Sequence, residues 1–275
     1  MEKILLVMDA KTPDNTSVDF AAKIADLTNS RLTAVFIENL NFHSIPMGGI
    51  DNPAYFAAFE QQSVTLKADT EQTVRIFKET CQKKGIIADV YVDKGDPIKE
   101  VIFESRFADL MIIDPAINFY NREEEMPSDF IREILSFSEC PVMLSPEEFD
   151  DIEEIVFCYD GSVSSVFAIK QFSYLLPEFS NKKALLLEVK KTSRQEFNEK
   201  DRRMMDWLHT HYSFARYHSL NGDVKDELFA YLFMQKNKLV VMGAYGRSLL
   251  SNLFKKSSAD LLIRTVDLPL FITHH

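Results

Sequence analysis

Short apolar runs alternate with longer amphipathic stretches along the whole chain. Continuous apolar runs such as 184–187 are typical of strands that are buried on both faces of a sheet. The pattern predicts strands in the first half at 3–9, 31–38, 86–92, 109–114 and 140–145, and in the second half at 154–160, 183–189, 213–219, 238–243 and 268–273. Between the strands of the second half it predicts helices at 163–177, 193–211, 223–236 and 257–265. Alternating strands and helices indicate parallel pairing with right-handed crossovers.

The chain also repeats itself. Each half opens with an apolar strand that ends in aspartate, contains a Gly-Asp pair ahead of a predicted helix, and closes on an apolar strand that follows proline. These landmarks come in the same order at Asp9, 95–96 and 140–144, and at Asp160, 222–223 and 268–272. Two copies of one unit explain them better than chance does. The sequence therefore predicts an α/β protein of two tandem doubly wound, Rossmann-like domains, each with a five-stranded parallel sheet.

The length of 275 residues suits two such domains. We place the boundary in the acidic, proline-containing stretch 145–151, which gives domains 1–147 and 148–275. The joint is short, so we expect the halves to pack together. The first half is longer between its second and third strands, because of an insertion at 39–83 that includes a long polar helix at about 54–83. Such an insertion is an interaction surface or a tolerated extra segment rather than a lid.

The composition of the chain excludes several classes of binding partner. The formal net charge is -11, and no basic run is longer than a pair, which argues against nucleic acid or an anionic membrane as the main partner. No stretch of about 18 apolar residues is present that could span a bilayer. The N-terminus enters a strand without a secretory signal, so we expect a cytoplasmic protein. The three cysteines lack metal-ligand spacing and are expected to be reduced and buried.

The candidate ligand-binding residues lie at the carboxyl ends of the predicted strands of the second half. In open parallel sheets, ligands bind beyond the carboxyl ends of the strands, where the strand order reverses. Asp160 ends the first strand of this half, and Gly161 and Ser162 follow at the turn into a helix. The carboxylate can accept hydrogen bonds from a ribose hydroxyl or a base amine, or it can cap the helix with Ser162; the two roles are compatible. Val189, at the end of the second strand, can form an apolar wall for a base.

A glycine-containing segment follows the fourth strand. Gly243 and Gly246 allow the backbone to approach an anion closely, although a plain strand-to-helix turn also needs glycine. Arg247 can pair with a phosphate oxygen or remain solvated. Ser257 and Ser258 begin the next predicted helix and can cap it or bind a phosphate.

The first half differs at the same places. Asp114 and Pro115 begin the segment that corresponds to the glycine segment, so we expect no nucleotide phosphate there. We name no catalytic residue, because no histidine lies in a recognisable context with a serine or cysteine nucleophile. We name no metal site either, since the acidic run 123–125 has no histidine or cysteine beside it and suits a solvated loop.

At this point the landmarks resemble the universal stress protein family in its tandem form, over nearly the whole chain. The segment 159–162, Tyr-Asp-Gly-Ser, looks like the family's opening strand and turn. ATP-binding members carry Gly-x-x-Gly, nine further residues, and Gly-[Ser/Thr]. Here Gly243, Gly246 and Ser257 match, but Lys256 stands where the motif has its third glycine. Lys256 either offers a charge to a phosphate or fills the space that glycine leaves open.

The resemblance implies a fold of the adenine nucleotide alpha hydrolase type and a cofactor, ATP with Mg. It implies that Asp160 and Val189 contact adenosine and that Gly243, Gly246, Arg247 and Ser257 hold phosphates. In the first half, Asp9 and Ile37 match the adenosine side while the phosphate loop is lost. Family members commonly pair through the last strand, here about 268–273. The two halves could therefore form a pseudo-dimer within one chain, or two chains a homodimer.

Three functions compete. The favoured hypothesis is a stress-response regulatory module that binds an adenine nucleotide in its second half, in keeping with the resemblance and the thin catalytic constellations. The alternative is a scaffold that acts by protein–protein contact alone, which Lys256 supports. The third is a slow ATP hydrolase, for which Asp160 is the only well-placed carboxylate.

Overall fold

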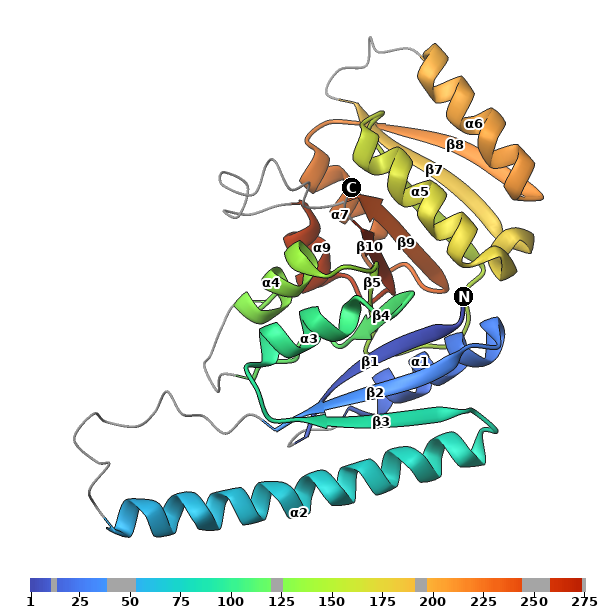
Figure 1. The fold of residues 1–275 in the computed structure, drawn as a ribbon. Helices are drawn as coiled ribbons and strands as arrows, with labels where there is room; N and C mark the ends of the chain where they lie inside the picture. The colour runs from blue at the N-terminus through green and yellow to red at the C-terminus, as the bar shows by residue number, and fades with distance from the viewer. Residues whose placement is uncertain (11–13, 39–52, 120–125, 191–196, 244–257, 274–275) are drawn as a thin grey trace.

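A computed structural model describes residues 1–10, 14–38, 53–119, 126–190, 197–243 and 258–273 (Figure 1). Strands and helices alternate in both halves, as the sequence predicts. The first half contains β1 (Lys3–Asp9), α1 (Asn15–Thr28), β2 (Arg31–Ile37), α2 (Pro53–Lys83), β3 (Ala88–Asp93), α3 (Pro97–Ser105), β4 (Leu110–Ile113), α4 (Asp129–Phe137) and β5 (Val142–Leu144). The second half contains β6 (Glu154–Tyr159), α5 (Val163–Leu175), the 3-10 helix η2 (Pro177–Asn181), β7 (Lys183–Lys190), α6 (Glu199–His211), β8 (Phe214–Asn221), α7 (Val224–Leu232), β9 (Lys238–Gly243), α9 (Ser258–Thr265) and β10 (Leu270–Thr273).

The strands described form one sheet in the order β3-β2-β1-β4-β5-β10-β9-β6-β7-β8. Within each half the pairing is parallel, and the order follows the same path, with the reversal between β1 and β4 and between β6 and β9. The predicted fold of two doubly wound, five-stranded units is confirmed. The boundary at 147/148 falls between β5 and β6 and remains a prediction.

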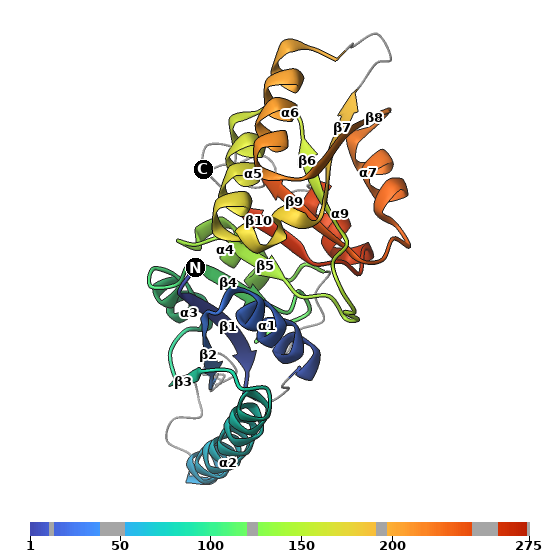
Figure 2. The same ribbon diagram turned by 90° about the vertical axis from the view of Figure 1, so that its right-hand side faces the viewer.

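The two halves meet where β5 and β10 pair antiparallel. Leu144 lies opposite Leu270, Met143 opposite Phe271, and Val142 opposite Ile272. The sheet therefore continues across the joint, and the same face points to the same side in both halves. Figure 2 shows the two halves stacked along one long molecule.

Each face of the sheet carries a hydrophobic core that runs through both halves. One core joins residues of α1, α2, α5 and α6 to the sheet, and the other joins residues of α3, α4, α7 and α9. On the first face, α2 contributes a buried stripe at Thr70, Thr73, Phe77 and Cys81, whose spacing places them on one side of the helix. The rings of Phe77 and Phe36 are 5.9 Å apart in an edge-on contact. The predicted long helix of the insertion is thus present and packs on the sheet.

The repeated Gly-Asp pairs are helix starts. Asp96 and Asp223 are the N-caps of α3 and α7, and each side chain accepts hydrogen bonds from two backbone N–H groups of the first turn. A Cβ on Gly222 would lie 2.6 Å from Oε1 of Glu227, and Gly222 has a φ of +152° that favours glycine. This part of the repeat therefore serves local folding.

Two predicted helices are too long. The helix predicted at 193–211 begins only at Glu199, because Asn198 is its N-cap and has an extended backbone. The sequence places the helix after β8 at 223–236, but α7 ends at Leu232. Met234 and Asn237 adopt positive φ angles of 58° and 59°, which a continuing α-helix does not allow. The chain turns there to enter β9.

A buried carboxylate ties the amino ends of the second-half strands together. Glu154 on β6 accepts hydrogen bonds from Lys238 on β9 at 2.6 Å and from Arg216 on β8 at 2.9 Å. Burial alone would raise the pKa of Glu154, but the hydrogen bonds and charges of Lys238 and Arg216 outweigh it and lower the pKa. Folding therefore stabilises the ionised carboxylate of Glu154 relative to its protonated form.

We expect Glu154→Gln to reduce the free energy of unfolding at neutral pH by about 1–3 kcal/mol, because two cationic partners lose their charged acceptor. A lowered pKa contributes stability above the unfolded value and loses it as the pH falls through the folded value. Urea titrations should therefore show the difference at pH 7 and its progressive loss as the pH falls below the ordinary glutamate pKa of about 4.3. Glu199→Gln, which breaks an exposed pair with Arg203, is the control and should cost little at either pH. A pH-independent loss in Glu154→Gln would contradict the ion-pair account.

Candidate nucleotide site

A pocket of about 220 Å³ opens at the carboxyl ends of β6, β7 and β9, where the strand order of the second half reverses. Three of the residues predicted for the site line it: Asp160, Val189 and Gly243. They come from three different strand ends, and their meeting in one pocket follows from the parallel topology. The remaining lining residues are Cys158, Tyr159, Ser165, Leu187, Val224, Leu228 and Met242.

The turn after β6 fixes the carboxylate of Asp160. Its Oδ1 accepts the backbone N–H of Ser162 at 2.9 Å, and Oγ of Ser162 accepts the N–H of Ser165 at 3.1 Å as the N-cap of α5. Gly161 between them has a φ of +74°, a conformation that side chains rarely adopt. Ser162 thus takes the helix-capping role that the sequence suggested, while Asp160 holds the turn ahead of the helix and faces the pocket.

The charge of this carboxylate is set by the same contacts. Burial by itself would raise the pKa of Asp160, but hydrogen bonds from Ser162 and Ser165 outweigh burial and lower the pKa. Asp160 is therefore ionised at neutral pH. An ionised carboxylate only accepts hydrogen bonds, so the pocket presents a fixed acceptor to hydroxyl or amine donors of a ligand.

Gly243 is required by packing. A Cβ at this position would lie 2.4 Å from the backbone oxygen of Ser164 in the first turn of α5. The end of β9 and the start of α5 therefore approach each other more closely than any side chain would permit. This is the structural role of glycine that the sequence left open beside the anion-binding role.

Alternate residues of the strands form the apolar wall of the pocket, and we did not single them out from the sequence. Cys158 lies two positions before Asp160, and Leu187 two positions before Val189, so each pair shares a face of its strand. Burial raises the pKa of the Cys158 thiol to about 12, so the thiol stays protonated. The period of two could have identified these residues once Asp160 and Val189 were chosen.

The other face of β7 carries a buried ion cluster. Nζ of Lys190 lies 3.3 Å from carboxylate oxygens of both Glu188 and Asp201, and Tyr217 donates its hydroxyl to Glu188 at 2.6 Å. Asp201 also accepts the N–H of Asn198 in the capping box of α6. Because Glu188 and Lys190 alternate with Val189, they point away from the pocket. The cluster fixes the start of α6 and takes no part in the candidate site.

Part of the predicted site lies outside the described residues: Gly246, Arg247, Lys256 and Ser257. Ser258 is the first residue of α9. The helix that was expected to follow the glycine segment is therefore present.

The corresponding end of the first half carries aspartates. Asp14, the N-cap of α1, accepts the N–H groups of Thr16 and Ser17 and the hydroxyl of Ser17. Asp114 follows β4, and burial raises its pKa, with the nearby charges of Asp14 and Glu147 adding to the effect and the N–H of Ala116 opposing it. An anion at this end would meet two carboxylates, which agrees with the expectation that the first half takes no phosphate.

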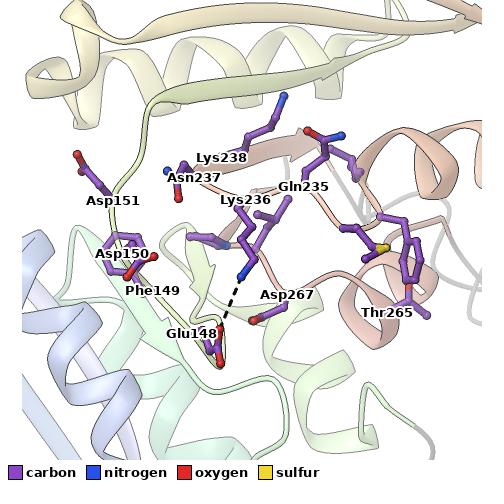
Figure 3. A pocket seen from close by; sticks show the side chains of 15 residues that line it. Glu148, Phe149, Asp150, Asp151, Gln235, Lys236, Asn237, Lys238, Thr265 and Asp267 are labelled. Atoms are coloured by element: carbon purple, nitrogen blue, oxygen red, sulfur yellow. Dashed lines mark ion pairs between the residues drawn. The ribbon is translucent and has the colours of Figure 1, made fainter.

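A second pocket, of about 310 Å³, lies at the opposite ends of the strands, beside the joint (Figure 3). The stretch 148–151, the turn between α7 and β9, and the stretch 265–269 line it. Lys236 and Glu148 form an ion pair of 4.0 Å across it, with both side chains more than three-quarters exposed. Such a pair contributes little to stability. None of the predicted site residues lies there.

Within the described ranges, no group of three histidine, cysteine, aspartate or glutamate side chains could hold a metal ion. No helix in this part of the chain is long and apolar enough to cross a membrane.

Comparison with solved structures identifies the fold. The chain is similar to a universal stress protein from Archaeoglobus fulgidus, with 14% identity, 98% of both chains covered and a TM-score of 0.70. It is also similar to a protein of Pseudomonas aeruginosa described as a candidate universal stress protein, with 13% identity, 100% of this chain and 93% of that one covered, and a TM-score of 0.60. A functionally unknown protein of the same species matches with 13% identity, 100% and 92% coverage and a TM-score of 0.62.

The chain thus has the fold of universal stress proteins over its full length, and the resemblance seen in the sequence is confirmed for the fold. A scan against models of protein families finds no match. A search of curated proteins finds no match either.

We expect Gly243→Ala to destabilise the chain by about 1–3 kcal/mol, because the new methyl group meets backbone atoms of Ser164 that cannot rotate away. Thermal unfolding of the variant and the wild type measures the loss. Gly85→Ala is the matched control for the methyl group itself, since no atom lies within 4 Å of a Cβ there, although its φ of +70° carries its own strain. A Gly243→Ala protein as stable as the wild type would show that β9 and α5 do not approach as described.

Proposed function

We propose that this protein is a tandem universal stress protein whose second half binds an adenine nucleotide and serves as a regulatory binding module. The observation that carries the proposal is the pocket at the strand-order reversal, where Asp160, Val189 and Gly243 meet within a universal stress protein fold. These are three of the positions that the sequence resemblance assigned to the nucleotide.

The chemistry of the pocket suits a nucleoside. The ionised Asp160 accepts hydrogen bonds from ribose hydroxyls or from the amine of adenine. Leu187, Val189 and Met242 offer apolar surface to the faces of the base. A volume of about 220 Å³ is below the roughly 300 Å³ at which pockets for drug-sized ligands begin, so it suits the nucleoside part while the phosphates lie outside.

In this proposal, the phosphates lie toward the glycine segment and the start of α9. The N–H groups at a helix N-terminus favour an anion, and Gly246, Arg247, Ser257 and Ser258 are the residues proposed to hold it. A magnesium ion would then be bound mainly by phosphate oxygens and water, as is usual for this ion. Lys256 would add a positive charge in place of the third glycine.

The second candidate is a scaffold that binds no nucleotide. Lys256 favours it, because a long side chain in place of glycine can fill the space that the phosphates need. The aspartates at the corresponding end of the first half also support it, because their carboxylates make that end unsuited to anions.

Calorimetric titration with Mg-ATP separates the two functions. For a binding module we expect a micromolar dissociation constant in the wild type and a loss of about 10- to 100-fold in Asp160→Ala, because hydrogen bonds to a charged acceptor are lost. Asp96→Ala is the matched control: it removes an N-cap aspartate of α3 in the first half and should leave the affinity unchanged. Equal affinity of wild type and Asp160→Ala would reject the site, and the absence of heat in the wild type would favour the scaffold.

A further inference from the structure

The pocket of about 310 Å³ beside the joint, which we call the joint pocket, has an apolar wall and an acidic rim (Figure 3). Its apolar lining includes Leu232, Phe233, Met234, Leu268 and Pro269, and its carboxylates are those of Glu148, Asp150, Asp151 and Asp267. Of its two lysines, Lys238 is already engaged by Glu154. An engineered cavity of about 150 Å³ takes one benzene ring, so the joint pocket has room for two aromatic rings. It therefore suits an apolar ligand that also carries positive charge.

Met234 is exposed in this pocket, although local folding does not call for an apolar residue there. It is 84% exposed, the highest value among the large apolar residues of the described ranges. Its φ of 58° follows the end of α7, where glycine or asparagine is favoured because other residues meet a steric cost. Neither burial nor backbone conformation accounts for methionine at this position. A flexible thioether packs well against aromatic rings, so an aromatic partner would account for it.

A surface with the complementary chemistry lies at the end of α3. Phe103 and Phe107 are 48% and 60% exposed, and their ring centres are 5.5 Å apart in an edge-on contact. The guanidinium of Arg106 lies 5.8 Å from the centre of the Phe103 ring. Lys99 is exposed one turn earlier, on the same side of the helix as Phe103. These four residues, which we call the α3 knob, combine two aromatic rings with two positive charges.

The α3 knob and the joint pocket match in size and in charge. The pocket has room for two rings, and its rim carries the carboxylates that two cations need. No residue of the knob lines the joint pocket of its own chain, but every copy of the chain carries both features. Copies with a formal net charge of -11 repel one another, yet salt at about 0.1 M screens charges more than about 10 Å apart. Charges within the contact therefore decide the balance.

We propose that this chain associates with itself head to tail, with the α3 knob of one copy seated in the joint pocket of the next. The rings of the knob then lie against Met234 and Phe233, and its cations face the carboxylate rim. Two aromatic side chains bury about 300–500 Å², and the pocket a comparable area, so the contact falls short of the roughly 1,200 Å² of a stable interface. Association is therefore weak and appears at high protein concentration. The contact does not depend on nucleotide binding.

Sedimentation velocity over a wide range of protein concentration tests the contact with two substitutions at exposed positions. Phe107→Ala removes a ring of the knob, whereas Met234→Lys replaces the apolar rim of the pocket with a charge that repels the knob. Each variant alone should associate at least about tenfold more weakly than the wild type, as expected when one anchor of a contact is lost. An equimolar mixture should recover one contact, because the first variant keeps its pocket and the second keeps its knob. The mixture should therefore form dimers and nothing larger.

Three controls accompany these variants. Arg106→Glu should weaken association more than Arg203→Glu, which makes the same change of net charge at an exposed site on α6. Phe214→Ala removes an exposed ring from β8 and should leave association unchanged. Thermal unfolding verifies that each variant is folded, and Met234→Lys should keep the midpoint of the wild type because the exposed side chain makes no buried contact.

Weaker association of both single variants, with recovery in their mixture, supports the proposal. A wild type that stays monomeric at the highest concentration reached overturns it. Association that neither variant weakens, or two weakened variants whose mixture does not recover, overturns it as well, because the copies then meet through other surfaces. An Arg106→Glu chain that associates like Arg203→Glu would overturn the match of charge that selects this occupant.

Discussion

The antiparallel pairing of β5 with β10 is the contact on which the rest of the structure depends. Each strand is short and apolar, and each would otherwise leave an open sheet edge beside a hydrophobic core. Their pairing joins two parallel sheets into one and lets each core continue from one half to the other. The halves therefore behave as parts of one body, and α4 can reach α9 across the joint.

The two halves share one fold, but the carboxyl ends of their strands carry different residues. In the second half, Asp160, Ser162 and Gly243 leave a pocket with one ionised acceptor and a capped helix start. In the first half, the carboxylate of Asp14 caps the start of α1, and Asp114 follows β4. A duplicated unit can thus keep its core while the carboxyl ends of its strands diverge. The proposal that only the second half binds nucleotide rests on these few positions.

The sequence was sufficient for the strands, the repeat and the doubly wound order, because buried parallel strands leave continuous apolar runs that periodicity detects. It also placed Asp160, Val189 and Gly243 together, since parallel strands bring their carboxyl ends to one edge. It could not place the end of α7, which depends on the backbone conformations of Met234 and Asn237. Nor could it show that Arg132 meets Asp260, because that contact arises from the packing of two helices 128 positions apart, from 132 to 260, across the joint.

The central claim is that one end of this duplicated fold binds nucleotide and the other does not. Native mass spectrometry of the intact chain with an excess of Mg-ATP tests it most directly, because it counts bound nucleotides per chain. The account predicts one ATP per chain and no second binding event as the ATP concentration rises. Two bound nucleotides would contradict the exclusion of phosphate by Asp14 and Asp114, and none would contradict the site at Asp160.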